Sequence, residues 1–230
     1  MTSTTAIVTG AGQGFGLALT TALAARGGTV VVCARDARRL HAATAGLPGV
    51  LALPGDVTDA GFRAELVAAA GERLDLLVHN AGELGPSPLP GLARYPLDAL
   101  RGVLETTVLA PLALTQLALP LLRAAGGTVV ALSSDAAVEA YEGWGGYGAA
   151  KAALDQIVAV LGVEEPVVRA YAFDPGDMRT AMHQRAFPGE DISDRPDPAT
   201  VVPAFLRLLD ERPTRGRYRA SDLAPAGTAP

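Results

Sequence analysis

Short runs of β-branched and other apolar residues alternate along this chain with longer segments rich in alanine and leucine. The short runs predict strands at Ala6–Thr9, Thr29–Cys33, Val50–Leu53, Leu74–His79, Thr128–Leu132 and Val167–Ala172. The longer segments predict helices at Gly14–Arg26, Ala37–Ala45, Gly61–Arg73, Leu97–Ala124 and Tyr147–Leu161. A last helix at about Pro198–Leu209 and a short strand near Arg217–Arg219 complete the pattern.

The predicted strands are apolar without alternation, which is typical of strands that are buried on both faces of a parallel sheet. Regular alternation of such strands with helices favours a single α/β domain with a Rossmann-type, doubly wound fold. We expect seven parallel strands in the order 3-2-1-4-5-6-7, joined by right-handed crossovers.

Two segments stand outside this alternation. The polar segment Met178–Pro198 predicts a long loop or lid, and loops of this length in compact domains are often functional. The segment Ser221–Pro230 is rich in alanine, proline and glycine and predicts a flexible tail. The domain is therefore expected to span residues 1–220, lid included.

Composition narrows the function classes. The 230 residues carry a net charge of −5, and no basic patch exists to displace counterions, so we expect no nucleic-acid partner. The single cysteine, Cys33, excludes an intramolecular disulfide, and the N-terminus has no signal-peptide pattern. The longest apolar run, Val108–Leu122, is interrupted by prolines and polar residues and is too short to span a bilayer. We therefore expect no membrane partner, and a single cysteine fits a reducing cytoplasm. No residues have metal-ligand spacing, so we expect no metal.

A glycine-rich turn follows the first predicted strand directly, in the order strand, glycines, helix. Gly10 permits a tight turn, Gly14 lets the backbone approach a phosphate, and Gly16 lets the helix pack closely on the strand. The helix N-terminus adds unpaired N–H groups and a partial positive charge. This turn, with Gln13 and Phe15 between its glycines, therefore predicts dinucleotide binding.

The spacing from Thr9 to Gly16, Thr-Gly-x-x-x-Gly-x-Gly, resembles the opening of the short-chain dehydrogenase/reductase family, and further family segments follow in order. They are Asp56-Val57, Asn80-Ala81-Gly82, Ser133-Ser134, Tyr147 to Lys151 (Tyr-Gly-Ala-Ala-Lys), and Pro175-Gly176 with Thr180. The resemblance covers about residues 5 to 220, and the stretch from Ser133 to Lys151 is loosely similar to sepiapterin-reductase-like members.

The resemblance implies a set of cofactor-binding residues. In the family, the counterparts of Asp56 and Val57 contact adenine, those of Asn80–Gly82 stabilise the central sheet, and the Pro175 segment closes over the nicotinamide. The full implied set is Gly10, Gln13, Gly14, Phe15, Gly16, Arg35, Asp56, Val57, Asn80, Ala81, Gly82, Tyr147, Lys151, Pro175, Gly176 and Thr180.

Three residues form a candidate catalytic group. Tyr147 and Lys151 are four apart on a predicted helix and share a face at about 5–6 Å. A neighbouring ammonium would favour the phenolate and lower the tyrosine pKa from about 10 toward the range of a general acid/base. Ser134 ends a strand, at the edge where open α/β sheets bind ligands, and its hydroxyl could hold a substrate carbonyl. By the resemblance, Lys151 also binds the nicotinamide ribose.

One position departs from the family. Members usually carry an asparagine in the fourth helix, and its backbone carbonyl binds a water that links the lysine to solvent. Counting back from Pro120, that position here is Thr107. Threonine has a backbone carbonyl too, but it does not by itself ensure the helix kink that exposes this group. The departure leaves slower catalysis or an altered chemistry open.

The end of the second strand indicates the cofactor. NAD-preferring members usually carry an acidic residue at the position of Ala34, and here Arg35 follows that alanine. A guanidinium suits a phosphate through paired, charge-assisted hydrogen bonds, so NADP(H) is favoured over NAD(H). Arg38 and Arg39 are interpreted as a solvated helix face.

These observations favour an NADPH-dependent carbonyl reductase or alcohol dehydrogenase that acts on a small ketone or aldehyde. A lyase or isomerase using the same Tyr147 and Lys151 pair stays open, as does a catalytically weak nucleotide-binding protein. Family members commonly pair through the helices that correspond to Leu97–Ala124 and Tyr147–Leu161, so a homodimer or homotetramer is expected. Asp177, Glu139 and Trp144 lie where they could reach a substrate, although packing is an equally simple interpretation for the tryptophan.

Overall fold

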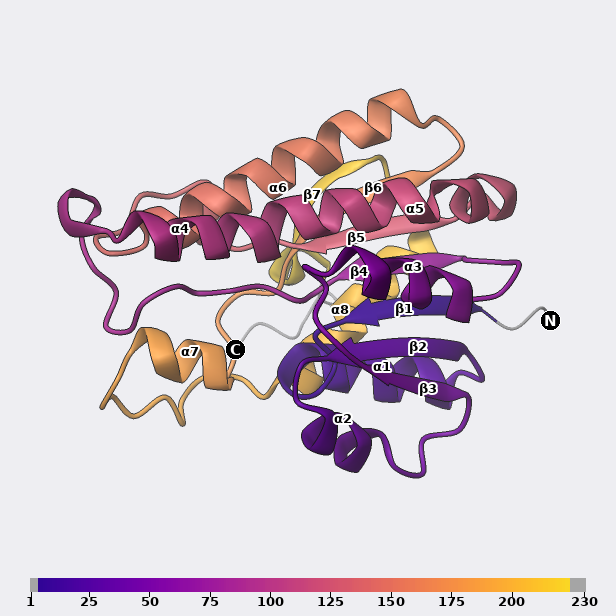
Figure 1. The fold of residues 1–230 in the computed structure, drawn as a ribbon, viewed down its shortest axis with the longest axis horizontal. Coiled ribbons are helices and arrows are strands. Elements are labelled where there is room, and N and C mark those ends of the chain that lie inside the picture. Colours follow the sequence, from indigo (N-terminus) through magenta and orange to yellow (C-terminus); the bar gives the residue numbers. More distant parts are fainter. Residues whose placement is uncertain (1–3, 224–230) are drawn as a thin grey trace.

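A seven-stranded parallel sheet forms the centre of the computed structural model, which describes residues 4–223. The strands lie in the order β3-β2-β1-β4-β5-β6-β7, and every neighbouring pair runs parallel. They are β1 (Thr5–Thr9), β2 (Thr29–Ala34), β3 (Val50–Pro54), β4 (Leu76–His79), β5 (Thr128–Leu132), β6 (Arg169–Asp174) and β7 (Gly216–Arg219) (Figure 1). The predicted fold class and strand order are confirmed.

Helices cover both faces of this sheet (Figure 1). They are α1 (Gly14–Ala25), α2 (Ala37–Thr44), α3 (Ala60–Ala69), α4 (Leu97–Leu104), α5 (Ala110–Ala125), α6 (Gly145–Glu164), α7 (Ala181–Ala186) and α8 (Pro198–Glu211). Short 3-10 turns lie at η1 (Leu92–Arg94), η3 (Asp135–Ala137) and η4 (Ala220–Leu223).

Alternate residues of each strand divide the core into two layers. Val8 of β1 packs in a cluster with residues of α1, α2 and α8, whereas its neighbour Ile7 packs with residues of α3, α5 and α6. Burial of both faces explains why the strands have no polar alternation. Because all strands are parallel, their carboxyl ends meet at one edge of the sheet, where ligands of such folds bind.

The long helix predicted at Leu97–Ala124 contains a π-helical turn, η2 (Glu105–Leu109), between α4 and α5. In this turn the Ala110 N–H donates to the Glu105 carbonyl, five residues back. Pro111 has no N–H to donate to the Thr107 carbonyl, so an unbroken α-helical ladder is impossible at this point. The irregularity expected of the family's asparagine position is therefore present around Thr107.

The predicted lid and tail are more ordered than the sequence suggested. The segment Met178–Pro198 contains α7 and buries His183, Ala186 and Ile192, so it is not a plain loop, and its role as a lid stays a prediction. In the predicted tail, Ser221 to Leu223 belong to η4, and Leu223 is buried in the core because its side chain completes the cluster under α8. The rest of that tail lies outside the described residues.

By length and composition alone, the helical stretch Leu97–Ala125 could cross a membrane. This stretch contains the apolar run Val108–Leu122. Its inner side supplies core residues, among them Val103, Leu114 and Leu122, as a core helix of a globular domain does.

Candidate active site

Hydrogen bonds hold the glycine-rich turn against the end of β4. Gly10 and Gly14 have φ angles of +69° and +58°, the left-handed region that favours glycine. The Asn80 side chain donates to the Thr9 and Gly10 carbonyls at 2.9 and 3.0 Å. A Cβ on Gly16 would lie 2.4 Å from Asn80 Nδ2, so Gly16 serves close packing, as predicted. Asn80 ties the turn to the sheet.

A first cleft of about 370 Å³ opens at the carboxyl edge of the strands beside this turn. Most of the predicted cofactor residues line it, namely Gly10, Gln13, Gly14, Phe15, Arg35, Asp56, Val57, Asn80, Ala81, Gly82, Tyr147, Lys151, Pro175 and Thr180. Gly16 does not line it, and Gly176 lines a second cleft instead. Gly16 lies outside the lining because its place is the packing contact with Asn80.

Several lining residues were missed from the sequence. They are Gly12, Cys33, Ala34, Asp36, Arg39, Gly55, Thr106, Leu132, Ser133, Met178, Ala181 and Met182. Most directly adjoin predicted motifs at strand ends, which was the available signal. Arg39 is the instructive case: it was interpreted as part of a solvated helix face, yet it lines the cleft and its Nη1 donates to Gln13 Oε1 at 2.6 Å.

The N-terminus of α1 borders the cleft without a capping side chain. Gln13 is the N-cap residue and makes no side-chain capping hydrogen bond. The first N–H groups of a helix have no intrahelical partner, and together with the helix dipole they favour an anion. Arg35 and Arg39 add two cations at the same end of the cleft, with Arg35 lying 3.4 Å from Glu83.

The structure brings Ser134, Tyr147 and Lys151 to one place. Tyr147 lies in the first turn of α6, which begins at Gly145, two residues earlier than predicted. Tyr147 and Lys151 are buried, 9% and 4% exposed. The Lys151 ammonium lies 5.5 Å from the centre of the Tyr147 ring and donates to the Leu132 carbonyl. A side-chain hydrogen bond links Tyr147 with Ser134.

Burial dominates the protonation of this group. It raises the pKa of the Tyr147 phenol, the hydrogen bond with Ser134 lowers it, and the nearby carboxylates of Asp135, Asp174 and Asp155 raise it further. Burial also lowers the pKa of Lys151 to about 8, against the carboxylates of Asp155 and Asp174. The predicted lowering of the tyrosine pKa by Lys151 is therefore not found, because desolvation outweighs the neighbouring charge.

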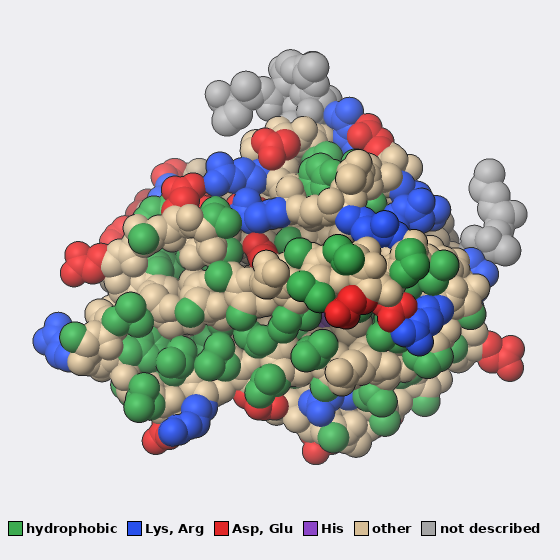
Figure 2. Space-filling model, turned by 90° about the horizontal axis from the view of Figure 1, so that it is seen from above, with side chains coloured by type: hydrophobic (Ala, Val, Ile, Leu, Met, Phe, Trp, Pro, Cys, Tyr) green, Lys and Arg blue, Asp and Glu red, His purple; other side chains and the backbone are tan. Residues whose placement is uncertain are grey.

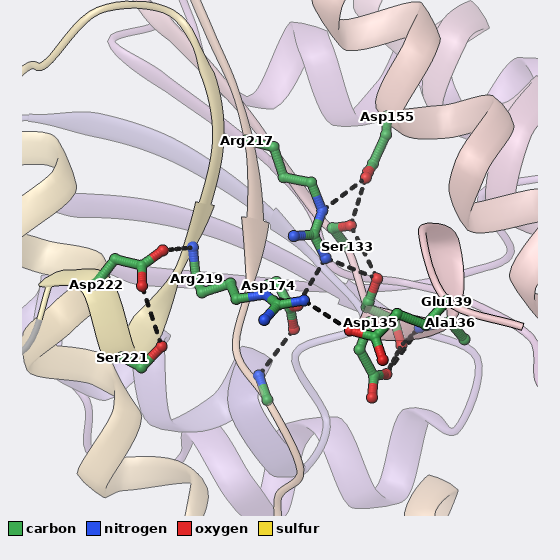
Figure 3. A network of polar contacts seen from close by, with 12 residues as sticks. Ser133, Asp135, Ala136, Glu139, Asp155, Asp174, Arg217, Arg219, Ser221 and Asp222 are labelled. Carbon is green, nitrogen blue, oxygen red and sulfur yellow. Dashed lines mark hydrogen bonds and ion pairs between the residues drawn. The ribbon is translucent and has the colours of Figure 1, made fainter. Parts of the chain in front are cut away.

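A polar network around Arg217, Asp155 and Asp174 adjoins the catalytic candidates (Figure 3). Arg217 of β7 lies between two carboxylates, with distances of 3.3 Å to Asp155 and 2.7 Å to Asp174. It also donates to the Ser134 carbonyl at 2.9 Å, and Asp155 accepts from the Ser133 hydroxyl at 2.6 Å. Sequence reasoning missed this network, although Asp155 stands four residues after Lys151 on the same helix face.

A second cleft, of about 450 Å³, adjoins the first. Tyr147, Pro175, Met178 and Thr180 line both clefts, so they lie at the boundary between the two. Ser134 and Trp144 line the second cleft only. The arrangement can hold one ligand in each cleft, with the tyrosine between them.

Thr107 lies in the π-helical turn beside this group. It is fully buried, and its hydroxyl accepts from the Glu83 N–H at 3.3 Å. A Cβ on Gly82 would lie 3.8 Å from both the Thr107 hydroxyl and the Lys151 ammonium. The residue therefore occupies the neighbourhood in which the family's asparagine was expected.

Comparisons with known proteins agree with this geometry. Residues 4–191 match the sequence model of a family described as short chain dehydrogenase. An uncharacterized oxidoreductase of Escherichia coli K12, YciK, is 34% identical over 70% of this chain, and the match spans 64% of the length of that relative. Sepiapterin reductase of Meriones unguiculatus is 35% identical over 78% of this chain and 76% of its own.

Solved structures agree as well. A short-chain dehydrogenase of Escherichia coli CFT073, complexed with NADPH, superimposes with a TM-score of 0.83. It is 31% identical in sequence, and the match covers 94% of this chain and 95% of that one.

Proposed function

The chain belongs to the short-chain dehydrogenase family and is an oxidoreductase of that type, and from this premise we propose that it is an NADPH-dependent carbonyl reductase acting on small ketones or aldehydes. One observation carries the proposal: Tyr147 lines both clefts, between the glycine-rich turn and the ring-lined second cleft. A proton donor at this boundary can serve a carbonyl held beside a cofactor.

The residues around the first cleft fit a dinucleotide. Gly12 faces Ala34 so closely that a Cβ there would lie 3.1 Å from the alanine methyl, so no side chain of residue 12 enters the cleft at this point. The uncapped N-terminus of α1 suits the pyrophosphate, and Arg35 with Arg39 suits a 2′-phosphate. Asp56 and Val57 would border the adenine, and Lys151 would hold the nicotinamide ribose.

When bound, NADPH supplies the hydride. Ser134 orients the substrate carbonyl with its hydroxyl, and Tyr147 donates the proton to the carbonyl oxygen. Lys151, with a pKa lowered to about 8 by burial, keeps a positive charge near the phenol at neutral pH and stabilises the phenolate left behind. Arg217 fixes Ser134 through the backbone carbonyl, so the hydroxyl keeps its place.

Lys151 is the only lysine of this chain, although lysines and arginines together number 19. An ammonium is a compact charge on a flexible stem, whereas a guanidinium is larger and planar. The role assigned to Lys151 needs a compact charge at a buried position, which explains a lysine in a chain whose other cationic side chains are arginines.

Cofactor preference gives the first prediction. Arg35→Ala and Arg39→Ala should each weaken NADPH binding by about ten- to hundredfold, because each removes one charge-assisted contact to the 2′-phosphate. Binding of NADH should change little. The measurement is a titration of each variant with both cofactors. Arg38→Ala is the matched control, since Arg38 lies on the same helix but does not line the cleft. Equal losses for both cofactors would assign the two arginines a different role.

We also propose that the chain forms a homodimer or homotetramer through α4–α5 and α6. Large apolar side chains are exposed on these helices. They are Leu97, Leu109 and Leu117 in the stretch from α4 to α5, and Val160 and Val163 in α6. Figure 2 looks onto this face and shows hydrophobic side chains spread over it. Contiguous exposed apolar surface of this kind marks association sites.

Leu117→Glu tests that interface. A buried, unpaired carboxylate is costly, so this change should shift the protein toward the monomer in sedimentation at micromolar concentration. Leu51→Glu on β3 is the control, because Leu51 is similarly exposed but lies away from these helices. A wild-type protein that sediments as a monomer contradicts the proposal.

The experiment that tests the function is the oxidation of NADPH in the presence of ketones and aldehydes, followed by its absorbance. Consumption of NADPH that matches the alcohol formed supports a carbonyl reductase. If NADPH binds but no carbonyl compound causes its oxidation, the result would favour the alternative of a nucleotide-binding protein.

A further inference from the structure

Aromatic rings form one wall of the second cleft. Trp144 lies edge-on to Tyr147 at 5.6 Å between ring centres, and Phe187 lies 5.9 Å from Trp144. His183 lies 4.9 Å from Phe187 and extends the same wall. Leu84, Met178 and Met182 add further apolar surface to the lining. Such a lining suits a flat ring, because ring faces and thioether side chains pack well on aromatic ligands.

The charged side chains that line this cleft, among the described residues, are carboxylates. Asp135, Asp174 and Asp177 line it, and no lysine or arginine among residues 4–223 does so. Asp174 is neutralised by Arg217 at 2.7 Å, whereas Asp177 is half-exposed and has only long contacts, 3.6 Å to Arg195 and 3.7 Å to His183. The cleft therefore attracts a cation and repels an anion.

Of the three carboxylates that line this cleft, Asp135 is the one without an ion pair to a residue in the described part of the chain. It accepts from the Ala136 N–H at 2.8 Å, the Ser134 hydroxyl at 3.0 Å and the Tyr141 hydroxyl at 3.1 Å, all of them neutral donors. Its negative charge therefore stays uncompensated beside the serine that orients the carbonyl.

An unpartnered nitrogen stands in the wall of the same cleft. His183 is 9% exposed, and its Nδ1 faces Asp177. Its Nε2 is buried and has no hydrogen-bond partner among the described residues. Buried polar atoms are nearly always paired, so an unpaired one in a ligand cleft indicates a contact that the ligand completes.

Building on the proposed reductase function, we propose that the second cleft selects carbonyl compounds in which a flat aromatic or heteroaromatic ring carries a protonated amine. The ring packs on Trp144 and Phe187, and the carbonyl meets Ser134 and Tyr147. The ammonium group lies near Asp135 and Asp177. The matched carboxylate compounds are rejected, because their charge meets the same two side chains.

Three matched ketones test this selection: para-acetylbenzylamine, para-acetylbenzyl alcohol and para-acetylphenylacetate. They share the reacting carbonyl and the ring, and they differ in charge. We expect kcat/KM to fall in that order, with the amine preferred over the carboxylate by at least about tenfold, since partly exposed ion pairs add modest free energies. Higher ionic strength should narrow the preference. Equal rates, or a preference for the carboxylate, would overturn the proposal.

Variants of the two aspartates show whether their charge causes the preference for the amine over the carboxylate. The double variant Asp135→Asn/Asp177→Asn keeps the shape and one acceptor oxygen on each side chain but removes both charges, and the ratio of amine to carboxylate should fall by several-fold or more. The ratio is informative even if the rates drop, because both substrates undergo the same chemistry. Glu72→Gln is the control: it changes one charge on an exposed side chain close before β4, at the amino end of the strands. A ratio unchanged in the double variant refutes the assignment to Asp135 and Asp177.

Binding gives a readout apart from turnover. Trp144 is the only tryptophan of the chain and lines the second cleft, so its fluorescence reports occupancy directly. Titration of the full chain with the three ketones should give affinities in the order amine, alcohol, carboxylate. If this order holds but no ketone consumes NADPH, the selection stands and the reductase function fails. If ketones are reduced without any preference, the function stands and the selection fails.

Discussion

Tyr147→Phe should lower the turnover number by about 10²–10⁴-fold, the usual contribution of a positioned general acid. Phenylalanine keeps the ring and its edge contact with Trp144 at 5.6 Å, so packing of the buried side chain is preserved. The hydroxyl is lost, with its transferable proton and its hydrogen bond to Ser134. Affinity for NADPH should change little, because Lys151 is unaltered. Steady-state rates and a cofactor titration measure the two quantities separately.

Tyr218→Phe is the matched control for this variant. Its hydroxyl donates to the Thr214 carbonyl near β7, and it lines neither cleft. Turnover in this control should stay near the wild-type value. A Tyr147→Phe protein with near wild-type turnover would mean that Tyr147 is not the proton donor. A role as a lyase, an isomerase or a nucleotide-binding protein would then have to be considered again.

Lys151→Met should damage both turnover and cofactor binding. Methionine fills part of the space of the lysine stem, but it removes the charge near the phenol and the donor to the ribose hydroxyls. We expect turnover to fall by about 10²-fold or more and NADPH affinity by about tenfold. Lys151→Arg should not restore activity, because a planar guanidinium is larger than the ammonium and does not fit the same buried position. A variant that loses turnover but binds NADPH normally would mean that Lys151 does not bind the ribose.

The same residue allows a direct pH measurement. Since Lys151 is the only lysine, protein made with isotope-labelled lysine gives a single side-chain NMR signal. Burial lowers its pKa, so the signal should titrate near 8 and not near the ordinary lysine pKa of 10.5. Asp155→Asn should lower this pKa further, because the Asp155 carboxylate raises it. Titration near the ordinary pKa would mean that Lys151 is solvated in solution.

The fold was predictable because its signals are local and repeated. Apolar strands without alternation mark a parallel sheet, and the glycines at Gly10, Gly14 and Gly16 have steric roles that follow from their spacing. The contacts found at Gly16 and Asn80 agree with those roles. Ser134, Tyr147 and Lys151 could be grouped in advance because strand ends and helix starts meet at one edge of such a sheet.

The remainder depends on tertiary contacts that no local pattern reports. Arg217 joins Asp155 and Asp174 across β7, β6 and α6, elements far apart in the sequence. The direction of the Tyr147 pKa depends on burial, which spacing along a helix cannot give. The π-helical turn did have a local signal, since Pro111 removes the donor for the Thr107 carbonyl.

The most direct test of the central claim is isotopic. NADPH carrying deuterium on the transferable position of the nicotinamide is incubated with the protein and para-acetylbenzyl alcohol, and the product is analysed by mass spectrometry. The account predicts a secondary alcohol with one deuterium at the former carbonyl carbon in the wild-type protein, and little or none in the same time with Tyr147→Phe. Alcohol formed without deuterium, or formed equally fast by the variant, would contradict hydride transfer with Tyr147 as the proton donor.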